Sequence, residues 1–320
     1  MKLRILKCHG SDNDFILIDE TIEKNHIRDA HRAELAKTLC DREMGIGADG
    51  VLFHLPSESA DCGMRMFNPD GSEAEMCGNG LRCIGRYALE KSARDRVSVE
   101  TMKSILSVTK ESRLFDGVET FQAEIGPVSL APGSLPMIAD AETFIDGRIA
   151  GLSDTLRFTA LSVPNPHIIA IVDEVDEDLV ERYGRAANDL PVFPKGVNIS
   201  FVELLDSDKI FVATYERGVG VTYSCGTGMS AAAYACALRD LVDGGKPISV
   251  YNRGGIVECD VSNKEGPILL KGNATFVFEA TIEVRWDCTS MELPYEKRIR
   301  QHEIDAYGNL REYAKSIIGK

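Results

Sequence analysis

The chain has 320 residues, of which 44% are hydrophobic and 27% are charged, and its formal net charge is −14 at pH 7. This length and composition are those of an ordinary globular protein with room for two domains, each with its own core. The acidic balance and the lack of any Lys- and Arg-rich block exclude nucleic acid as an expected partner, because phosphate binding needs clustered basic side chains.

The N-terminal residues Met1–Gly10 interleave charged with apolar side chains and contain no continuous apolar segment. They predict a β-strand rather than a signal peptide. No run of about 18 apolar residues occurs, so a membrane partner is not expected. A cytoplasmic location is therefore the default expectation.

Short β-like runs dominate the chain, and helices are few. In chain order, strands are expected at Leu3–Lys7, Phe15–Asp19, Val51–Leu55, Met64–Phe67, Val97–Thr101, Ile105–Thr109, Thr155–Ser162, His167–Asp173, Val197–Glu203, Ile210–Tyr215, Ile248–Tyr251, Ile256–Asp260, Ile268–Lys271 and Phe276–Val284. Helical spacing of apolar residues predicts helices at Ile27–Arg42, Leu81–Ala93, Glu177–Ala187 and Met229–Val242.

Two stretches of unusual composition divide this pattern. The turn-rich stretch Gly126–Pro136 is the best candidate for a linker. The C-terminal segment Cys288–Lys320 is charged, helix-permissive and poor in β-branched residues. We therefore expect it to be an appendage rather than part of the core.

The nine cysteines form no C-x-x-C pair, and no H-E-x-x-H occurs. Zinc-ligand spacing is absent, and an odd number of cysteines in a chain of this size does not suggest a disulfide scaffold. The default expectation is nine reduced thiols, most of them small buried side chains. A functional cysteine must therefore be distinguished by its surroundings.

Two cysteines share a setting. The segments Glu75–Arg82 and Tyr223–Ser230 both contain C-G-x-G followed by a predicted helix, and Cys77 and Cys225 lie 148 positions apart, on opposite sides of the candidate linker. Strands precede the motif in both cases. This match suggests two duplicated α/β halves related by a pseudo-twofold axis.

A cysteine just before a helix lies beside unpaired N–H groups and the positive end of the helix dipole, which should lower the pKa of its thiol. The glycines let the main chain approach a ligand and aim several N–H groups at one carboxylate. Two facing motifs could then invert a stereocentre, one thiolate removing a proton while the other thiol supplies one. The helix ends would stabilise the enolate-like charge. The alternative is that both cysteines are ordinary residues at glycine-rich helix caps.

At these motifs the sequence resembles the diaminopimelate epimerase family. The first-cysteine block Phe67–Cys83 matches the family signature almost throughout. The strand Phe276–Val284 resembles the family's closing strand. The other matching blocks, in the expected order, are His9–Phe15, Gly45–Gly50, Pro164–His167, Gly196–Asn198 and Tyr215–Gly228.

The resemblance implies an α/β (α+β) fold of two pseudo-symmetric domains, each a mixed or antiparallel sheet wrapped around a central helix, with the active site in the cleft between them. It places an N-terminal half at residues 1–127, with a returning strand at about 274–287, and a C-terminal half at 128–273. The helical appendage is then 288–320. A homodimer is a family tendency.

The resemblance also implies conversion of LL- to meso-diaminopimelate in lysine and peptidoglycan-precursor biosynthesis, without pyridoxal phosphate, metal or another cofactor. Cys77 and Cys225 would be the acid/base pair. The main-chain amides expected to hold the reacting carboxylate are those of Gly78, Asn79, Gly226 and Thr227. The side chains expected to bind the substrate's polar groups are Asn13, Asn68, Asn165, Asn198, Glu216 and Arg217.

The chemistry of these side chains agrees with a substrate that has two zwitterionic ends. Arg217 can grip a carboxylate with two hydrogen bonds, and Glu216 can take an ammonium group. Each Asn could instead be an ordinary turn residue, although Asn68 before Pro-Asp-Gly could do both. His167 could orient a ligand or tune Cys225, or it could be a packed residue at the start of a strand.

Three positions depart from the family pattern. Ser11-Asp12 stands where the family has x-Gly, which should reshape the first turn. Gly50 stands where some members have Gln, and Val221 replaces a common acidic residue. The segment after about Cys288 has no counterpart in the family core, and we assign it no function.

Three other functions remain open from the sequence. A related racemase acting on histidine or a proline derivative would keep both cysteines and lose the side chains that recognise the distal end. A hydrolase or acyl transferase with a single thiol would use one cysteine with His167 and could dispense with the other. A binding protein without catalysis would not need two intact C-G-x-G motifs.

Overall fold

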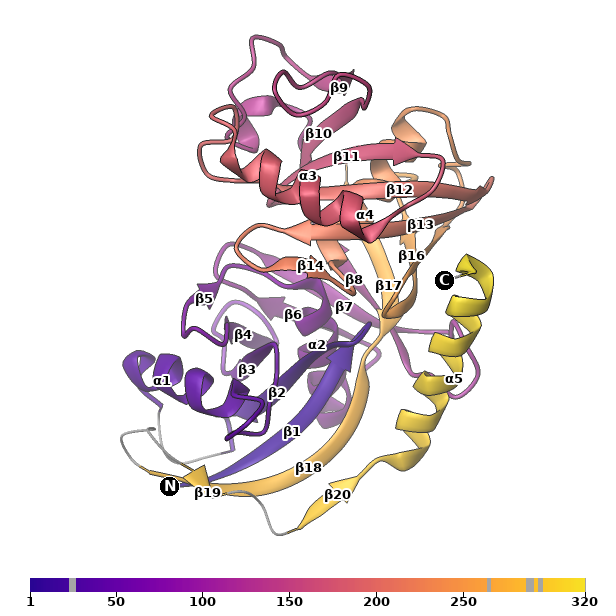
Figure 1. Cartoon of the computed structure of the whole chain (residues 1–320). Helices are drawn as coiled ribbons and strands as arrows, with labels where there is room; N and C mark the ends of the chain where they lie inside the picture. Colours follow the sequence, from indigo (N-terminus) through magenta and orange to yellow (C-terminus); the bar gives the residue numbers. More distant parts are fainter. Residues whose placement is uncertain (23–26, 264–265, 286–290, 293–295, 320) are drawn as a thin grey trace. The chain divides into compact units, whose positions relative to one another are not determined.

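The computed structural model describes residues 1–22, 27–263, 266–285, 291–292 and 296–319. The chain forms two compact units, and Figure 1 shows their elements coloured along the sequence. Unit 1 comprises Met1–Ala123 and Gly272–Leu310, and unit 2 comprises Glu124–Lys271 and Arg311–Lys320. The cleft expected between the two halves stays a prediction.

Unit 1 is a mixed sheet with two helices in its N-terminal segment. Its elements are β1 (Lys2–Gly10), β2 (Asn13–Asp19), α1 (Asp29–Cys40), β3 (Gly50–Leu55), β4 (Cys62–Phe67), β5 (Glu73–Ala74), α2 (Gly78–Ser92), β6 (Arg96–Glu100), β7 (Ile105–Glu111), the start of β8 (Thr120–Ile125), β18 (Thr275–Val284), β19 (Met291–Glu292), β20 (Lys297–Ile299) and the first part of α5 (Gln301–Ile318). Strands β1 and β2 form an antiparallel hairpin, β2 and β3 are parallel, β3 and β4 are antiparallel, and β4 and β6 are parallel. Strand β18 pairs with the free side of β1.

Unit 2 repeats this order of pairings. Its elements are the 3₁₀ turn η1 (Pro132–Ser134), β9 (Phe144–Gly147), β10 (Phe158–Ser162), β11 (Pro166–Val172), α3 (Glu177–Asp189), β12 (Asn198–Asp206), β13 (Lys209–Glu216), β14 (Gly220–Thr222), α4 (Gly226–Leu238), β15 (Ile248–Asn252), β16 (Gly255–Asp260) and most of β17 (Ile268–Asn273). Strands β10 and β11 are antiparallel, β11 and β12 are parallel, β12 and β13 are antiparallel, and β13 and β15 are parallel. The repeat confirms the predicted duplication, with α2 and α4 in equivalent places.

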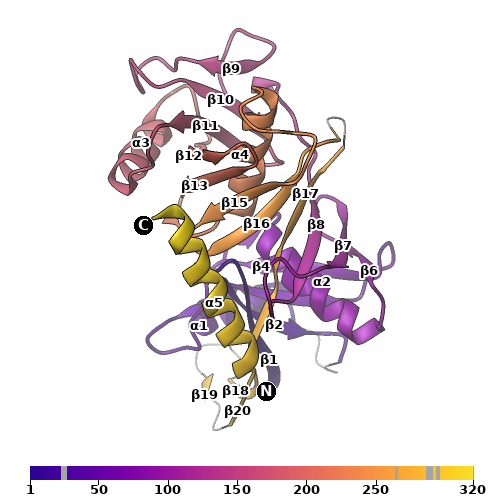
Figure 2. The ribbon, with the colours of Figure 1, turned by 90° about the vertical axis from the view of Figure 1, so that its right-hand side faces the viewer.

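Each unit wraps its sheet around one helix, as predicted. Helix α2 contacts β1 to β4, β6 and β7, whereas α4 contacts β10 to β13, β15 and β16; Figure 2 shows both helices from a second direction. Helix α4 is apolar on nearly all sides, from Met229 to Cys236, and a helix of this kind must be buried. In α2 a Cβ added to Gly85 would lie 2.4 Å from Val108, so this glycine permits close packing of the helix on β7.

The outer layers are made by the crossover helices. In unit 1, α1 contributes Leu35, Ala36 and Leu39 to a core that includes β1 to β3. In unit 2, α3 contributes Val180 and Ala187 to a core with β10 to β12. The four predicted helices are therefore confirmed, with ends that differ by a few residues.

Two segments differ from the composition-based expectations. The candidate linker Gly126–Pro136 belongs to unit 2, where Leu135 is fully buried in the core. The C-terminal helix α5 packs rather than projects: Tyr307 and Leu310 cluster with Val118, and Ala314 joins the core of unit 2. Cys288, where the change of composition begins, lies outside the described residues.

In the described ranges, no helix combines the length and apolar character needed to cross a membrane.

Candidate active site

Cys77 begins helix α2 in unit 1. Its backbone is extended, and its Sγ accepts a hydrogen bond from the N–H of Gly80 at 3.5 Å, so the cysteine is the N-cap. A Cβ at Gly80 would lie 2.9 Å from Leu52, which explains why the fourth motif position must be small. We call Asn13, Asn68 and Cys77–Asn79 the unit-1 cluster.

Asn13 and Asn79 meet beside Cys77. The Asn13 Oδ1 lies 3.6 Å from Cys77 Sγ and accepts a hydrogen bond from Asn79 Nδ2 at 3.3 Å. The Asn79 Oδ1 accepts in turn from Arg82 Nη2 at 2.9 Å. Arg82 is fully buried, and its Nε donates to the carbonyl of Asn273 at 3.0 Å. A buried cation one turn into α2 therefore fixes the amides next to the thiol.

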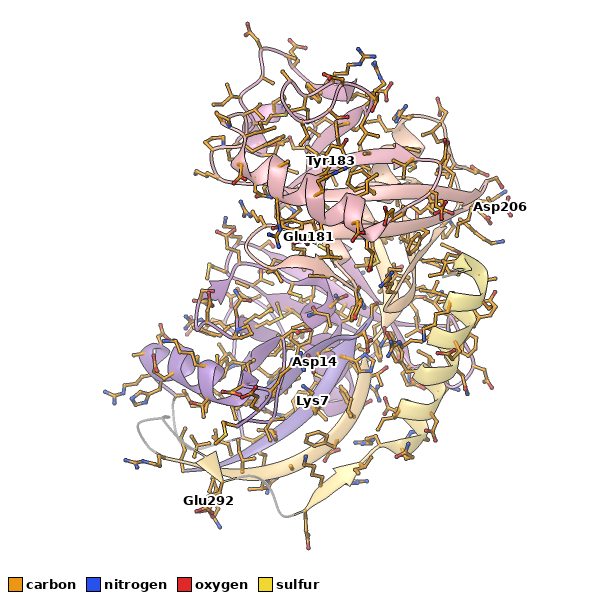
Figure 3. The ribbon with its side chains drawn as sticks, in the orientation of Figure 1. Lys7, Asp14, Glu181, Tyr183, Asp206 and Glu292 are labelled. Carbon is orange, nitrogen blue, oxygen red and sulfur yellow. The ribbon has the colours of Figure 1, made fainter. Side chains whose placement is uncertain are left out.

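A network of ion pairs holds Asn13 from the other side. Asn13 Nδ2 donates to Asp49 Oδ2 at 2.9 Å, and Arg42 bridges Asp49 and Asp14 at 2.8 Å each. Lys7 on β1 and Asp14 on β2 are labelled in Figure 3, and their Nζ–Oδ2 distance is 2.5 Å. Because Lys7 and Asp14 are largely buried, this network fixes the start of β2 more firmly than surface pairs would.

Ser11 and Asp12, which depart from the family pattern, form the turn between β1 and β2. The φ angles of Ser11 and Asp12 are 51° and 69°, and Gly10 pairs with Asn13 across the turn. Two central residues with positive φ are typical of a type I′ hairpin turn, which favours glycine. Here the Ser11 N–H donates to Asn273 Oδ1 at 2.7 Å, which stabilises the turn that positions Asn13.

Asn68 makes local bonds. Its main-chain N–H donates to the carbonyl of Ser72, and its Nδ2 donates to Ser72 Oγ at 3.0 Å. It therefore closes the turn between β4 and β5, which is the ordinary role that the sequence also allowed. Its expected substrate contact stays a prediction.

Cys225 begins helix α4 in unit 2 in the same way. Its Sγ accepts from the N–H of Gly228 at 3.4 Å. A Cβ at Gly228 would lie 2.8 Å from Thr214 Oγ1, so this position also has no room for a side chain. We call Asn165, His167, Asn198, Glu216, Arg217 and Cys225–Thr227 the unit-2 cluster.

The expectation that the helix start lowers the thiol pKa is wrong for Cys225 in this structure. The side chain is only 6% exposed, and burial raises its pKa well above the usual range. The carboxylate of Glu216 raises the pKa further, whereas hydrogen bonds from Thr227 and Gly228 lower it. Desolvation therefore outweighs the helix terminus, and Cys225 is a thiol at neutral pH.

His167 is linked to Cys225 through one hydroxyl. Its Nε2 lies 2.9 Å from Asn165 Oδ1 and 3.1 Å from Thr227 Oγ1, and this Oγ1 lies 3.5 Å from Cys225 Sγ. Burial, and then the charge of Arg217, lower the pKa of His167 to about 3. The ring is therefore neutral. It is packed, as one interpretation expected. Its contact toward Cys225 is with the Thr227 hydroxyl, and its effect on the thiol or on a ligand stays a prediction.

The remaining polar residues of the unit-2 cluster lie at strand ends. Glu216 ends β13, and its Oε1 accepts from Thr222 Oγ1 at 2.6 Å. Asn198 begins β12, and its Oδ1 accepts from the N–H of Arg217 at 3.0 Å. The Arg217 Nη1 donates to the carbonyl of Lys195 at 3.0 Å. The fold thus gathers Glu216 with Cys225, and Asn198 with Arg217.

Several residues of this arrangement received no role from the sequence, among them Asp49 and Arg82. Asp49 was within a matched block, Gly45–Gly50, and Arg82 within the first-cysteine block. The available signal was their charge: an Arg on the helix that follows C-G-x-G, and an Asp directly before a strand. Because charged residues are usually exposed, such positions are easily assigned to solvent.

The other departures have local explanations. A Cβ at Gly50 would lie 3.0 Å from the carbonyl oxygen of Phe67, so a larger residue would require a shift of the strand. Val221 lies in β14 and packs against the core of unit 2. Within the described ranges, no three His, Cys, Asp or Glu side chains are grouped so that they could hold a metal ion.

None of the eight described cysteines forms a disulfide, and Cys77 is the most exposed of them. Among the described cysteines, only Cys77 and Cys225 are helix N-caps. Their setting, rather than their number or spacing, therefore separates them from the other described thiols.

Comparisons with known proteins identify the family to which the chain is similar. A family model described as diaminopimelate epimerase matches residues 5–120 and 159–277. A diaminopimelate epimerase of Clostridium acetobutylicum is 42% identical over 320 residues, covering 98% of this chain and 96% of the relative. One of Listeria welshimeri is 45% identical over 311 residues, covering 93% and 94%. The family model ends at residue 277, but the Clostridium match continues into the C-terminal segment.

Solved structures share the fold at low identity. A PhzF-family phenazine biosynthesis protein of Bacillus anthracis has a TM-score of 0.61 at 16% identity, covering 88% of this chain and 99% of the other. A hydroxyproline epimerase of Agrobacterium vitis, with bound trans-4-hydroxy-L-proline, has a TM-score of 0.59 at 18% identity, covering 88% and 90%. These likenesses concern the fold alone.

Proposed function

Because the chain belongs to the diaminopimelate epimerase family, we propose that it interconverts LL- and meso-diaminopimelate in the biosynthesis of lysine and peptidoglycan precursors. The observation that carries the proposal is the pair of equivalent helix starts, each with a cysteine as N-cap and a glycine three residues later. A single-thiol enzyme has no need of the second motif.

Cys77 and Cys225 serve as opposed acid and base on one α-carbon. The thiolate takes the α-proton from one face, and the thiol gives its proton to the other face, so the two cysteines exchange protonation states in each turnover. The main-chain N–H groups that follow each cysteine lie at the positive end of a helix dipole, and they stabilise the charge that develops on the carboxylate. The reaction needs no cofactor in this scheme.

The polar residues of the two clusters bind the rest of the substrate. Arg217 supplies a cation for the distal carboxylate, and Glu216 supplies an anion for an ammonium group. Asn13, Asn68, Asn165 and Asn198 supply amides that can donate or accept. A proline-type racemase has no distal zwitterion to recognise, so this set supports diaminopimelate.

A cytoplasmic location is part of the proposal, because two reactive thiols must stay reduced to act as acid and base. The cytosol keeps thiols reduced, whereas oxidising compartments favour disulfides. A homodimer remains an expectation from the family.

The test is α-proton exchange with solvent. LL-diaminopimelate is incubated in deuterated water, without added cofactor, with the wild type, Cys77→Ala and Cys225→Ala, and the product is analysed by mass spectrometry and chiral chromatography. We expect deuterium at the α-carbon and meso product with the wild type only. Full epimerisation by either single variant would refute the two-base scheme. A reductant is present throughout, since oxidised thiols would also be inactive.

A further inference from the structure

The Thr227 hydroxyl lies between His167 and Cys225. Its Oγ1 is 3.1 Å from His167 Nε2 and 3.5 Å from Cys225 Sγ. Thr227 is 7% exposed, Cys225 is 6% exposed and His167 is fully buried. Water therefore competes little for these contacts, and their directions matter for the charge on the thiol.

Asn165 sets the direction of the first hydrogen bond. Its Oδ1 lies 2.9 Å from His167 Nε2, and an amide oxygen can only accept. A neutral ring carries a single proton, so this contact assigns the proton to Nε2. Thr227 Oγ1 then accepts from the same N–H, and its own hydroxyl proton is free to point at Cys225 Sγ.

Different neighbours stabilise the two forms of Cys225. The carboxylate of Glu216, at the end of β13, favours the thiol. The N–H of Gly228, 3.4 Å from Sγ, favours the thiolate but is fixed in the main chain of α4. His167, at the start of β11, acts through Thr227, and Arg217 acts on His167. Thr227 is thus the side-chain donor that can turn toward Sγ when the thiol loses its proton.

We propose that the Thr227 hydroxyl donates a hydrogen bond to the Cys225 thiolate during turnover, and that His167 fixes the direction of this bond. The inference rests on the proposed two-base function and goes beyond the main-chain role expected for Thr227. Both Thr227 and His167 are positioning residues, because each keeps its own proton throughout. The only proton that moves at this cluster is that of the Cys225 thiol.

The test compares Thr227→Val, which keeps the shape but lacks the hydroxyl, with Thr227→Ser, which keeps the hydroxyl. The rate of Cys225 alkylation by iodoacetamide is measured against pH in the full-length protein, and the modified peptide is quantified by mass spectrometry. We expect Thr227→Val to raise the apparent pKa of Cys225 by about one to two pH units, the size expected for a hydrogen bond to a charged group. Thr227→Ser should stay within a few tenths of the wild type.

Steady-state kinetics provide the second readout. Thr227→Val should lower kcat roughly ten- to a hundredfold, with little change in KM because its main-chain N–H remains. His167→Gln should shift the alkylation profile in the same direction as Thr227→Val, which keeps the proposal testable if the valine variant does not fold. Circular dichroism checks the fold of each variant.

An alkylation profile of Thr227→Val that superimposes on that of the wild type overturns the proposal. Alkylation needs no substrate, so the proposed hydrogen bond and the proposed epimerase function can fail separately. A shifted profile in a protein without epimerase activity would support the hydrogen bond and refute the proposed function. An active epimerase with an unshifted profile would refute the hydrogen bond alone.

Discussion

His167 is a buried base that stays uncharged. Its pKa is lowered to about 3, from an ordinary value of 6.5, mainly by burial. Between these two values the unfolded chain binds a proton at this residue and the folded chain does not. The contribution of the neutral His167 ring to the free energy of unfolding is therefore fully present above about pH 6.5. It is lost progressively as the pH falls toward 3.

We predict that this loss appears in the free energy of unfolding. Between pH 6 and pH 4 the wild type should lose about 1.4 kcal/mol more per pH unit than His167→Gln, which cannot titrate in this range. Urea denaturation at a series of pH values measures the difference, and other titrating groups cancel in the comparison. Parallel curves for the two proteins would show that His167 is protonated in the fold.

The residues of the candidate site were predictable to different extents. The C-G-x-G motif predicted that Cys77 and Cys225 begin helices, because helix starts have a local sequence signature. The high pKa of Cys225 was not predictable, because it depends on burial and on Glu216, which tertiary packing brings to the thiol. Similarly, the first-cysteine block contained Arg82, but its partner Asn273 is 191 positions away.

At the scale of elements, helix α5 is anchored in unit 1 by a buried ion pair. Glu303 is 5% exposed and forms two hydrogen bonds with Arg86 of α2, at 2.5 and 2.9 Å. The same carboxylate accepts from the N–H of Phe276 at 3.0 Å. The guanidinium of Arg86 also lies over the ring of Phe276, 3.8 Å from its centroid. The C-terminal helix therefore neutralises a charge on the helix that begins with Cys77.

We predict that Glu303→Ala is strongly destabilising. It leaves the cation of Arg86 buried without this carboxylate, and the loss of one partner from a buried pair costs about 3–5 kcal/mol. The matched control is Glu312→Ala, which removes an exposed carboxylate from the same helix and should cost about 0–1 kcal/mol. Urea unfolding followed by circular dichroism compares the two variants. Equal effects would mean that the buried pair adds nothing specific.

The composition of the C-terminal segment explains why this anchor was missed. Its charged residues predicted a helix, which α5 confirms, but they also suggested a solvated appendage. Glu303 looks like any other acid in a charged run, and Arg86 is 217 positions earlier. Strands and helices with regular apolar spacing could be predicted from local pattern, whereas a pairing at this separation could not.

At the scale of the whole molecule, α5 contributes to both cores. Tyr307 and Leu310 belong to a cluster in unit 1 with Val118, whereas Ala314 and Ile318 belong to the core of unit 2. A segment outside the family model thus completes both units.

We predict that removal of residues 301–320 lowers the stability of both units. The four buried apolar side chains include Leu310 and Ile318, each of which contributes about 1.5–3 kcal/mol when fully buried. Several kcal/mol correspond to a fall in Tm of roughly 10 °C or more for a protein of this size. Differential scanning calorimetry measures it, with a chain ending at Ile318 as the control. An unchanged Tm would show that α5 is dispensable.

The division of unit 1 into two chain segments has a consequence for synthesis on the ribosome. The residues of unit 1 up to Ala123 emerge long before Gly272–Leu310, and unit 2 takes its last residues from the final turns of α5. Until β18 is made, one side of β1 is an open edge available for wrong pairing. A chain released before α5 is translated has neither unit finished, so a truncated product should be degraded faster than the full-length protein.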